Sequence, residues 1–230
     1  MCRSFLAFAP YLLAIQKERS AAGPDEPCWI NGFMPALDGV ALYGLIALKK
    51  PKRFLEIGSG TSTQFAHKAI VDQRLDTRII SIDPHPRAEI DRLCAQVIRS
   101  AAEDVDLSVF DQLEANDMLY VDNSHQVFMN SDATVVFLDI LPRLKPGVLV
   151  HIHDVTLPYD YPEGWVRWHF AEQYLLACYL LARGNRFDIV FAGAFASSDD
   201  PLKRVMDPLF TREEFRGVET HGCAFWIQMR

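Results

Sequence analysis

The sequence predicts an α/β fold: a doubly wound, mostly parallel sheet of seven strands with a C-terminal antiparallel hairpin. Three observations support this prediction. Short apolar runs alternate with segments of helical periodicity from residue 53 to about residue 183. Glycines or acidic residues follow the ends of most of these runs. The last two runs, 187–192 and 223–229, have no helix of ordinary length between them, which favours antiparallel pairing.

The segment before the first strand is expected to be helical. Residues 5–19 and 37–48 are predicted as helices with a loop at 23–27, and Gly44 would permit a close backbone contact. Residues 1–50 are therefore expected to form a helical cap and residues 51–230 the main domain. The cap is either a lid over a ligand cleft or the surface of a homo-oligomer, and the sequence leaves both open.

The remaining elements follow in alternation. Strands are predicted at residues 54–57, 78–83, 96–99, 118–121 and 148–152, and helices at 64–72, 88–95, 134–144 and 168–183. The hydroxyls of residues 61–63 are expected to cap the helix at 64, and Gly184-Asn185 the helix at 168–183. Ligands of such sheets bind beyond the carboxyl ends of the strands, so the residues found there are the candidates for a site.

A glycine turn follows the first strand. Gly58 and Gly60 come between that strand and the next helix, where a Cβ atom would hold a ligand away from the backbone. The free N–H groups and the positive dipole end of the helix favour a bound polar group. Asp83 ends the second strand, where a carboxylate can accept the hydroxyls of a ribose.

Composition excludes several classes of function. A net charge of −7 argues against a nucleic-acid groove, which needs clustered Lys and Arg. No apolar run approaches the roughly 18 residues of a membrane span. The five cysteines are widely spaced with no Cys-x-x-Cys pair, which indicates a reducing compartment and predicts a cytoplasmic protein.

These residues together resemble a class I S-adenosylmethionine-dependent methyltransferase. The resemblance begins with Glu56-Ile-Gly58-Ser-Gly60-Thr-Ser and Ser81-Ile-Asp83-Pro. It continues through Tyr120-Val-Asp122-Asn-Ser-His125, Leu141-Pro-Arg-Leu-Lys-Pro-Gly147 and His151-Ile-His-Asp154, and covers about residues 40–230. The later stretches are similar to a bacterial branch that includes sugar O-methyltransferases of antibiotic pathways and many members of unassigned substrate.

The resemblance implies S-adenosylmethionine as the cofactor. Its candidate contacts are Glu56, Gly58, Ser59, Gly60, Thr61, Asp83, Pro84, Glu103, Asp104 and Asp122. Among them, Glu56, Gly58 and Gly60 would shape the methionine pocket and Asp83 would hold the ribose. Glu103 or Asp104 would lie near the adenine, although the usual Gly-Asp pair is missing there.

Methyl transfer to a hydroxyl requires a base or a metal ion that lowers the cost of deprotonation. Asp122 and Asp154, at the ends of adjacent strands, are candidates to share Mg²⁺ or another divalent ion, as carboxylates at these strand ends do in catechol-type relatives. His125 is either a further metal ligand or a cap on the following helix. Val155 and His153 depart from the metal-dependent pattern, and His153 is the alternative general base. His151 is expected to face the core.

Residues 158–162 and Trp165 form an aromatic, proline-containing segment after the fifth strand, which suits a ring or a sugar face of a small-molecule acceptor. Trp168 is expected in the core. The predicted function is methyl transfer to such an acceptor, with His153, Asp154 and Asp122 as catalytic candidates. A nicotinamide-dependent oxidoreductase is the first alternative, although Thr63 stands at the third glycine of Gly-x-Gly-x-x-Gly. A non-catalytic cofactor-binding module is the second.

Overall fold

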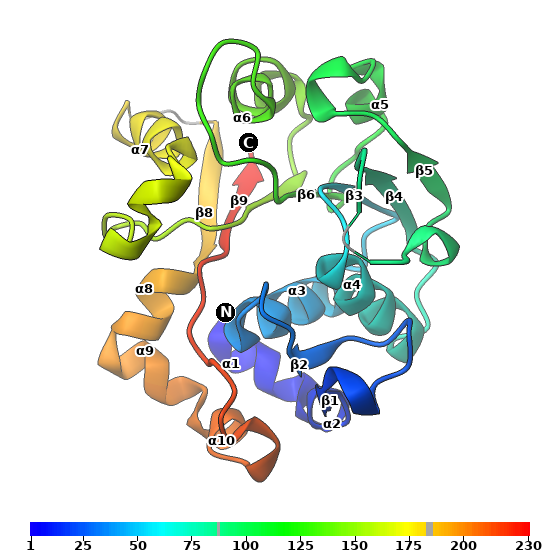
Figure 1. Ribbon diagram of the computed structural model, residues 1–230, viewed down its shortest axis with the longest axis vertical. Coiled ribbons are helices and arrows are strands. Elements are labelled where there is room, and N and C mark those ends of the chain that lie inside the picture. Colours follow the sequence, from blue (N-terminus) through cyan, green and yellow to red (C-terminus); the bar gives the residue numbers. More distant parts are fainter. Residues whose placement is uncertain (87, 183–185) are drawn as a thin grey trace.

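The computed structural model describes residues 1–86, 88–182 and 186–230. At its centre lies a seven-stranded sheet in the order β5-β4-β3-β6-β7-β9-β8 (Figure 1). The strands are β3 (Arg53–Ile57), β4 (Arg78–Ile82), β5 (Gln96–Ile98), β6 (Met118–Val121), β7 (Leu149–Ile152), β8 (Phe187–Ala192) and β9 (Phe225–Met229). β9 pairs antiparallel with both β7 and β8, whereas the other strand pairs described in this sheet are parallel, which confirms the predicted fold class. The strand order reverses between β3 and β6, and open sheets of this kind bind ligands at such a point.

The central strands β3, β6 and β7 are buried on both faces, as expected for a parallel sheet between two layers of helices. Phe54 belongs to the hydrophobic cluster on one face and the adjacent Leu55 to the cluster on the other. Figure 1 shows α3 (Ala36–Lys49) and α4 (Thr61–Asp72) on the first side of the sheet. The second side carries α5 (Ser108–Asp111), α6 (Asp132–Val135) and α7 (Glu172–Leu181).

The N-terminal segment differs from the prediction of one helix at residues 5–19. It contains α1 (Cys2–Phe5), η1 (Leu6–Phe8) and α2 (Ala9–Leu13), then β1 (Gln16–Glu18), η2 (Arg19–Ala21) and β2 (Cys28–Ile30). β1 and β2 pair in parallel, so the polar residues after Leu13 leave the helix and make backbone hydrogen bonds to a strand. The helix predicted at 37–48 is present as α3. Gly44 in α3 does permit a close contact, but with a side chain: a Cβ there would lie 2.3 Å from the Phe5 ring.

Other predicted helices are shorter than expected. The helix predicted at 88–95 is wrong, because this stretch contains only the single turn η3 (Asp91–Leu93) before β5. The segment 134–144 is helical but irregular: α6 continues into a π-helical turn, η5 (Val136–Ile140), and then η6 (Leu141–Arg143), where Pro142 lacks a backbone N–H.

The C-terminal region also differs in detail. α7 begins at Glu172 after the 3-10 segment η7 (Glu163–Trp168), and Trp168, expected in the core, is 40% exposed. The predicted cap at Gly184-Asn185 lies outside the described residues. Short helical segments connect β8 to β9, namely α8 (Gly193–Ser198), α9 (Asp200–Val205), α10 (Asp207–Phe210) and η8 (Glu213–Phe215). Earlier in the chain, the short 3-10 helix η4 (Ala102–Asp104) follows β5.

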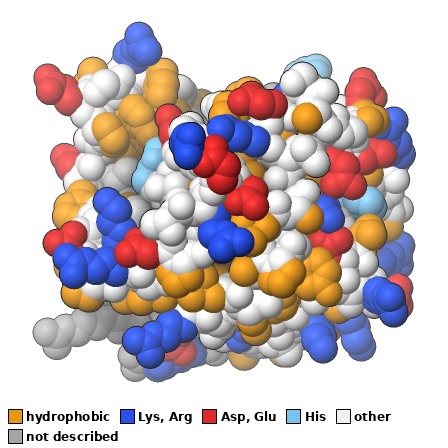
Figure 2. Space-filling model, turned by 90° about the horizontal axis from the view of Figure 1, so that it is seen from below, with side chains coloured by type: hydrophobic (Ala, Val, Ile, Leu, Met, Phe, Trp, Pro, Cys, Tyr) orange, Lys and Arg blue, Asp and Glu red, His pale blue; other side chains and the backbone are white. Residues whose placement is uncertain are grey.

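On the face shown in Figure 2, Lys and Arg side chains are interspersed with Asp and Glu. Within the described residues, no helix has both the length and the hydropathy needed to cross a membrane.

Candidate active site

The turn after β3 requires glycine at its first position. Gly58 has a φ of +77°, which side chains rarely adopt. A Cβ on Gly58 would lie 1.9 Å from the carbonyl oxygen of Asp122 at the end of β6. The close approach of these two strand ends therefore depends on the absence of a side chain at residue 58.

Glu56 supports this turn from inside the protein. Its carboxyl group is fully buried and receives hydrogen bonds from Ser62 Oγ (3.0 Å) and Thr63 Oγ1 (2.5 Å). Burial raises the pKa of Glu56 to about 8, and the nearby charges of Asp83 and Asp122 act in the same direction. The helix begins at Thr61 and not near residue 64, and of the predicted hydroxyl caps Thr63 Oγ1 accepts a hydrogen bond from Gly60 N (3.0 Å) at its start. Residues 61–63 form the first turn of α4, and two of their hydroxyls bind Glu56.

A cavity of about 320 Å³ lies beside the glycine turn. Among the predicted cofactor contacts, it is lined by Gly58, Ser59, Asp83, Pro84, Glu103 and Asp122. Asp83 Oδ2 accepts hydrogen bonds from Ser59 N (2.7 Å) and Ser59 Oγ (3.1 Å), and Oδ1 accepts one from His85 N (2.7 Å). Because a carboxylate oxygen can accept two hydrogen bonds, Oδ1 keeps one acceptor position for a ligand hydroxyl. Asp104, in contrast, is an exposed residue of η4.

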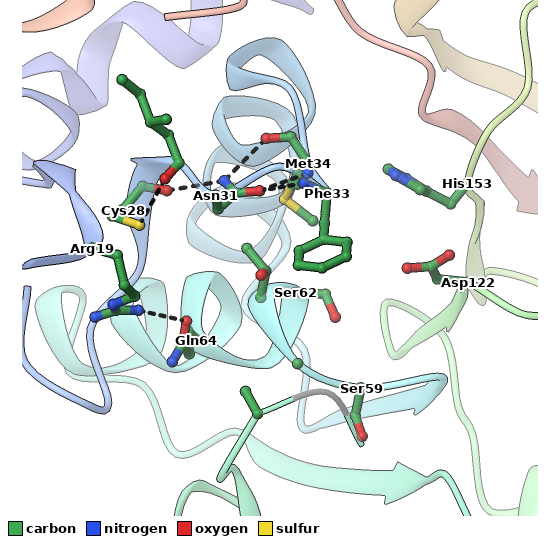
Figure 3. Close-up of a pocket in the computed structure, with 14 residues that line it drawn as sticks. Arg19, Cys28, Asn31, Phe33, Met34, Ser59, Ser62, Gln64, Asp122 and His153 are labelled. Atoms are coloured by element: carbon green, nitrogen blue, oxygen red, sulfur yellow. Dashed lines mark hydrogen bonds between the residues drawn. The ribbon is translucent and has the colours of Figure 1, made fainter. Parts of the chain in front are cut away.

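A second cavity of about 210 Å³ adjoins the first, and Ser59 and Asp122 border both. Figure 3 shows Asp122 and His153 on one side of it and residues of the N-terminal segment on the other. The N-terminal lining residues are Arg19, Cys28, Ile30, Asn31, Phe33 and Met34, and the wall near the turn includes Gly60 and Thr61. Asn31 shapes this wall, because its side-chain oxygen accepts hydrogen bonds from the backbone N–H groups of Phe33 (2.9 Å) and Met34 (2.7 Å).

The ends of β6 and β7 bring together Asp122, His125 and Asp154. His125 Nε2 lies 3.3 Å from Asp122 Oδ1 and 3.6 Å from Asp154 Oδ2, while Nδ1 lies 2.9 Å from Glu172 Oε2. Burial opposes protonation of His125, but its hydrogen bonds to Asp122 and Glu172 outweigh burial and raise its pKa well above the usual value. Both His125 (φ +56°) and Asp154 (φ +50°) have the left-handed backbone that non-glycine residues seldom adopt and that is often found at functional sites.

The alternative role of His125 as a helix cap is wrong. The next helix, α6, begins at Asp132, and Ser131 caps it by accepting a hydrogen bond from Thr134 N. His125 instead lies in the loop between β6 and α6, with 3% of its surface exposed. Its ring stands 4.6 Å, centroid to centroid, from the ring of Phe170.

His153 and His151 occupy different environments. His153 lines the second cavity, and its Nε2 lies 3.8 Å from Asp154 Oδ1. Burial lowers the pKa of His153, but the charges of Asp122 and Asp154 outweigh it, so the net shift is upward. His151 is buried in the core as expected, stacked on Tyr120 with ring centroids 3.8 Å apart, and burial lowers its pKa well below the usual value.

The aromatic segment after β7 lies next to these residues. Tyr161 contacts Trp165 (centroids 5.9 Å apart), and Trp165 contacts Trp168 (5.2 Å) and Phe170 (5.8 Å). Since Phe170 also contacts His125, this aromatic cluster adjoins the ends of β6 and β7. The predicted acceptor segment is thus close to the candidate catalytic residues.

Sequence reasoning missed Glu172. This residue is fully buried in the first turn of α7 and also accepts a hydrogen bond from Asn123 Nδ2 (3.1 Å). An acid in the first turn of a helix is ordinarily explained by the helix dipole, so the sequence contains no signal for its burial against His125.

A family of proteins described as "Methyltransferase domain" matches residues 55–155, which contain the glycine turn, Asp83, Asp122 and Asp154. Residues 55–155 are thus similar to a methyltransferase domain. A stretch of 94 residues is 34% identical to an uncharacterized protein of Archaeoglobus fulgidus, covering 37% of this chain but only 42% of that protein.

Solved structures of methyltransferases share the fold of this chain. The methyltransferase PaMTH1 of Podospora anserina, bound to SAH, is 15% identical with a TM-score of 0.51, over 99% of this chain and 88% of that one. The plantazolicin methyltransferase BpumL in complex with SAH is 12% identical with a TM-score of 0.50, over 83% of this chain and 85% of that one. Identities this low establish a shared methyltransferase fold and no more.

Proposed function

We propose that this domain transfers a methyl group from S-adenosylmethionine to a hydroxyl oxygen of a small-molecule acceptor. The observation that supports it most is the pair of adjoining cavities at the glycine turn, one lined by Asp83 and the other by His153. Asp122, from the end of β6, borders both. SAH in both structural neighbours supports the same cofactor here, since SAH is what remains of S-adenosylmethionine after methyl transfer.

The first cavity suits the nucleoside part of the cofactor. Without a Cβ at Gly58 the backbone of the turn is open to a ligand, and Asp83 Oδ1 has an acceptor position for a ribose hydroxyl. Glu103 lies on the same wall and is the candidate contact for the adenine. When bound, the cofactor supplies an electrophilic methyl group on a sulfonium ion.

The second cavity suits the acceptor. Residues 1–50 supply one of its walls through Asn31, Phe33 and Met34, in keeping with the proposed role of this segment as a cover. A hydroxyl placed here must lose its proton as the oxygen attacks. The raised pKa of His153 favours the protonated ring, which cannot take a proton, so we assign proton removal to the Asp122 carboxylate.

The same cluster suits a divalent cation. Asp122 Oδ1, Asp154 Oδ2 and His125 Nε2 are two hard oxygen donors and an imidazole nitrogen within a few ångströms of one another. Glu172 holds His125 Nδ1 by a hydrogen bond and thereby orients Nε2 toward the two carboxylates. A bound Mg²⁺ or Mn²⁺ would lower the pKa of the acceptor hydroxyl.

Acceptor-dependent release of SAH tests this proposal. The purified protein is incubated with S-adenosylmethionine and a panel of catechols, phenols and sugars, with EDTA and after restoration of Mg²⁺ or Mn²⁺. We expect SAH release with at least one acceptor class, and a loss of turnover of about 100-fold or more in Asp122→Asn. Asp139→Asn, at an exposed position of η5, is the matched control and should retain the full rate.

Two outcomes would contradict the proposal. Binding of NAD in preference to S-adenosylmethionine would support the oxidoreductase. Cofactor binding without methyl transfer to any acceptor class would support the non-catalytic module.

A further inference from the structure

The two carboxylate oxygens of Asp154 face different groups. Oδ2 faces His125, whereas Oδ1 lies 3.2 Å from Cys223 Sγ and 3.8 Å from His153 Nε2. On its other side, Cys223 Sγ lies 3.3 Å from Asp38 Oδ2. A second cluster of chemically different composition therefore adjoins the proposed active site, and the predicted function does not use it.

Three separate parts of the chain form this cluster. Asp38 comes from α3, His153 follows β7, and Cys223 precedes β9, and their exposed fractions are 1%, 3% and 5%. One donor atom from each lies within 4.8 Å of the other two. Residues 185 positions apart in the sequence thus bring a thiol, an imidazole and a carboxylate together in the interior.

Hydrogen bonding within the cluster is incomplete. A thiol has one proton and can donate to one acceptor, yet Cys223 Sγ contacts the carboxylates of both Asp38 and Asp154. His153 Nδ1 is buried and has no hydrogen-bond partner among the described residues. Buried polar groups normally find partners, so an excess of acceptors around a thiol beside an unpartnered imidazole nitrogen indicates a missing cation.

We propose that Asp38, His153 and Cys223 bind a zinc ion, with Asp154 Oδ1 as a fourth donor. Cysteine sulfur, histidine nitrogen and carboxylate oxygen are the ligands that zinc takes in tetrahedral sites. Donor atoms of such a site lie about 3.3–3.6 Å apart, from the usual zinc–ligand bond lengths. The contacts of Cys223 Sγ with Asp38 and Asp154, at 3.3 and 3.2 Å, fit this spacing. Binding displaces the proton of the Cys223 thiol and one ring proton of the protonated His153 to solvent.

The surroundings of Asp38 hold it in place for this role. Its carboxylate accepts the backbone N–H groups of Cys223 (2.8 Å to Oδ2) and Ala224 (3.0 Å to Oδ1). A Cβ on Gly222 or Gly193 would come within 2.5 or 3.0 Å of Asp38 Oδ1, so both glycines leave room for the carboxylate. The ion would tie α3 to the ends of β7 and β9.

Zinc at this position has a consequence for catalysis. His153 on the cavity wall would be a metal ligand and not a general base, which agrees with the assignment of proton removal to Asp122. The thiolate ligand also distinguishes this site from that of Asp122, His125 and Asp154 Oδ2, whose two carboxylates favour a harder cation.

Cobalt substitution tests the proposal without reference to methyl transfer. The full chain is freed of metal by a chelator, then titrated with Co²⁺ while its absorption spectrum is recorded, and Zn²⁺ stoichiometry is measured by elemental analysis. We expect one equivalent of bound Co²⁺ to give a thiolate-to-cobalt charge-transfer band. Added Zn²⁺ should abolish this band by displacing the Co²⁺. Cys223→Ser should lose the band, whereas Cys28→Ser, which alters another buried free cysteine, should keep it. Asp122→Asn should also keep it.

The absence of a charge-transfer band in the wild-type chain would overturn the proposal, as would a band that persists in Cys223→Ser. Cobalt binding that survives Cys223→Ser but is lost in Asp122→Asn would place the ion at the harder site instead. Should Cys223→Ser fail to fold by circular dichroism, His153→Gln removes a ligand and leaves the Asp38 backbone contacts intact. That variant is expected to shift the cobalt spectrum, and an unchanged spectrum would contradict the assignment.

Discussion

The buried Glu56 should make the stability of this protein fall as the pH rises toward 8. Its pKa is raised from an ordinary value of 4.5 to about 8, chiefly by burial. The folded state therefore keeps the proton in a pH range where the unfolded chain has lost it. Because the unfolded state binds fewer protons there, the free energy of unfolding decreases by about 1.4 kcal/mol per pH unit between these two values.

Replacement of Glu56 by Gln removes this dependence. The amide has nearly the same shape, and it can accept from one of the two hydroxyls of Ser62 and Thr63 and donate to the other. The variant should be about as stable as the wild type near pH 4.5. The free energy of unfolding of the variant should exceed that of the wild type by about 5 kcal/mol near pH 8, and the difference should stay constant above that pH. This value is the free energy that corresponds to the raised pKa of Glu56.

Urea unfolding of both proteins at a series of pH values measures this difference. Glu114→Gln is the matched control, because Glu114 is exposed and its replacement should give a nearly constant difference across the same range. A Glu56→Gln difference that does not change with pH would refute the reasoning, since it would mean that the carboxyl group is ionised inside the folded protein at no cost.

Two other predictions concern the site. Gly58→Ala should abolish cofactor binding, because the positive φ costs about 1–3 kcal/mol and the new Cβ would also displace the Asp122 carbonyl that borders both cavities. Binding of S-adenosylmethionine by titration calorimetry checks this result. Glu172→Gln should weaken Mn²⁺ binding about 10- to 100-fold, because the outer carboxylate no longer fixes His125 Nδ1. Titration of the metal-free protein with Mn²⁺ measures the change.

Each of these variants has a matched control. Gly217 has the same φ of +77° but no atom within 4 Å of an added Cβ, so Gly217→Ala should retain cofactor binding. An equal loss of cofactor affinity in Gly58→Ala and Gly217→Ala would show that backbone strain, and not the contact with Asp122, weakens binding. Glu163→Gln alters an exposed acid of η7 and should leave Mn²⁺ affinity unchanged. Wild-type Mn²⁺ affinity in Glu172→Gln would argue that His125 is not a ligand.

The sheet could be predicted from the sequence because its central strands are buried on both faces and its apolar runs end abruptly. The runs at 118–121 and 187–192 have the bounds that the structure shows, since a glycine or polar residue stops each apolar run where pairing ends. The glycine turn could be predicted as well, because Gly58 and Gly60 directly follow the apolar run of β3.

Features that depend on distant partners could not be predicted. β1 contains only polar residues, Gln16–Glu18, and becomes a strand because β2 pairs with it. Asp38 sits in an apolar helix and appears unremarkable until the fold places Cys223 beside it. Glu172 likewise gains its significance only from His125, 47 residues earlier. Such side chains carry no local pattern, and only the fold brings them together.

Calorimetric titration with S-adenosylmethionine tests the central claim most directly, on the wild type, Asp83→Ala and Asp104→Ala. The wild type should bind the cofactor, and Asp83→Ala should bind about 10- to 150-fold more weakly, the value of a lost hydrogen bond to a charged group. Asp104→Ala, at an exposed position, should match the wild type. Undiminished binding by Asp83→Ala, or no binding by the wild type, would contradict a cofactor site at the glycine turn.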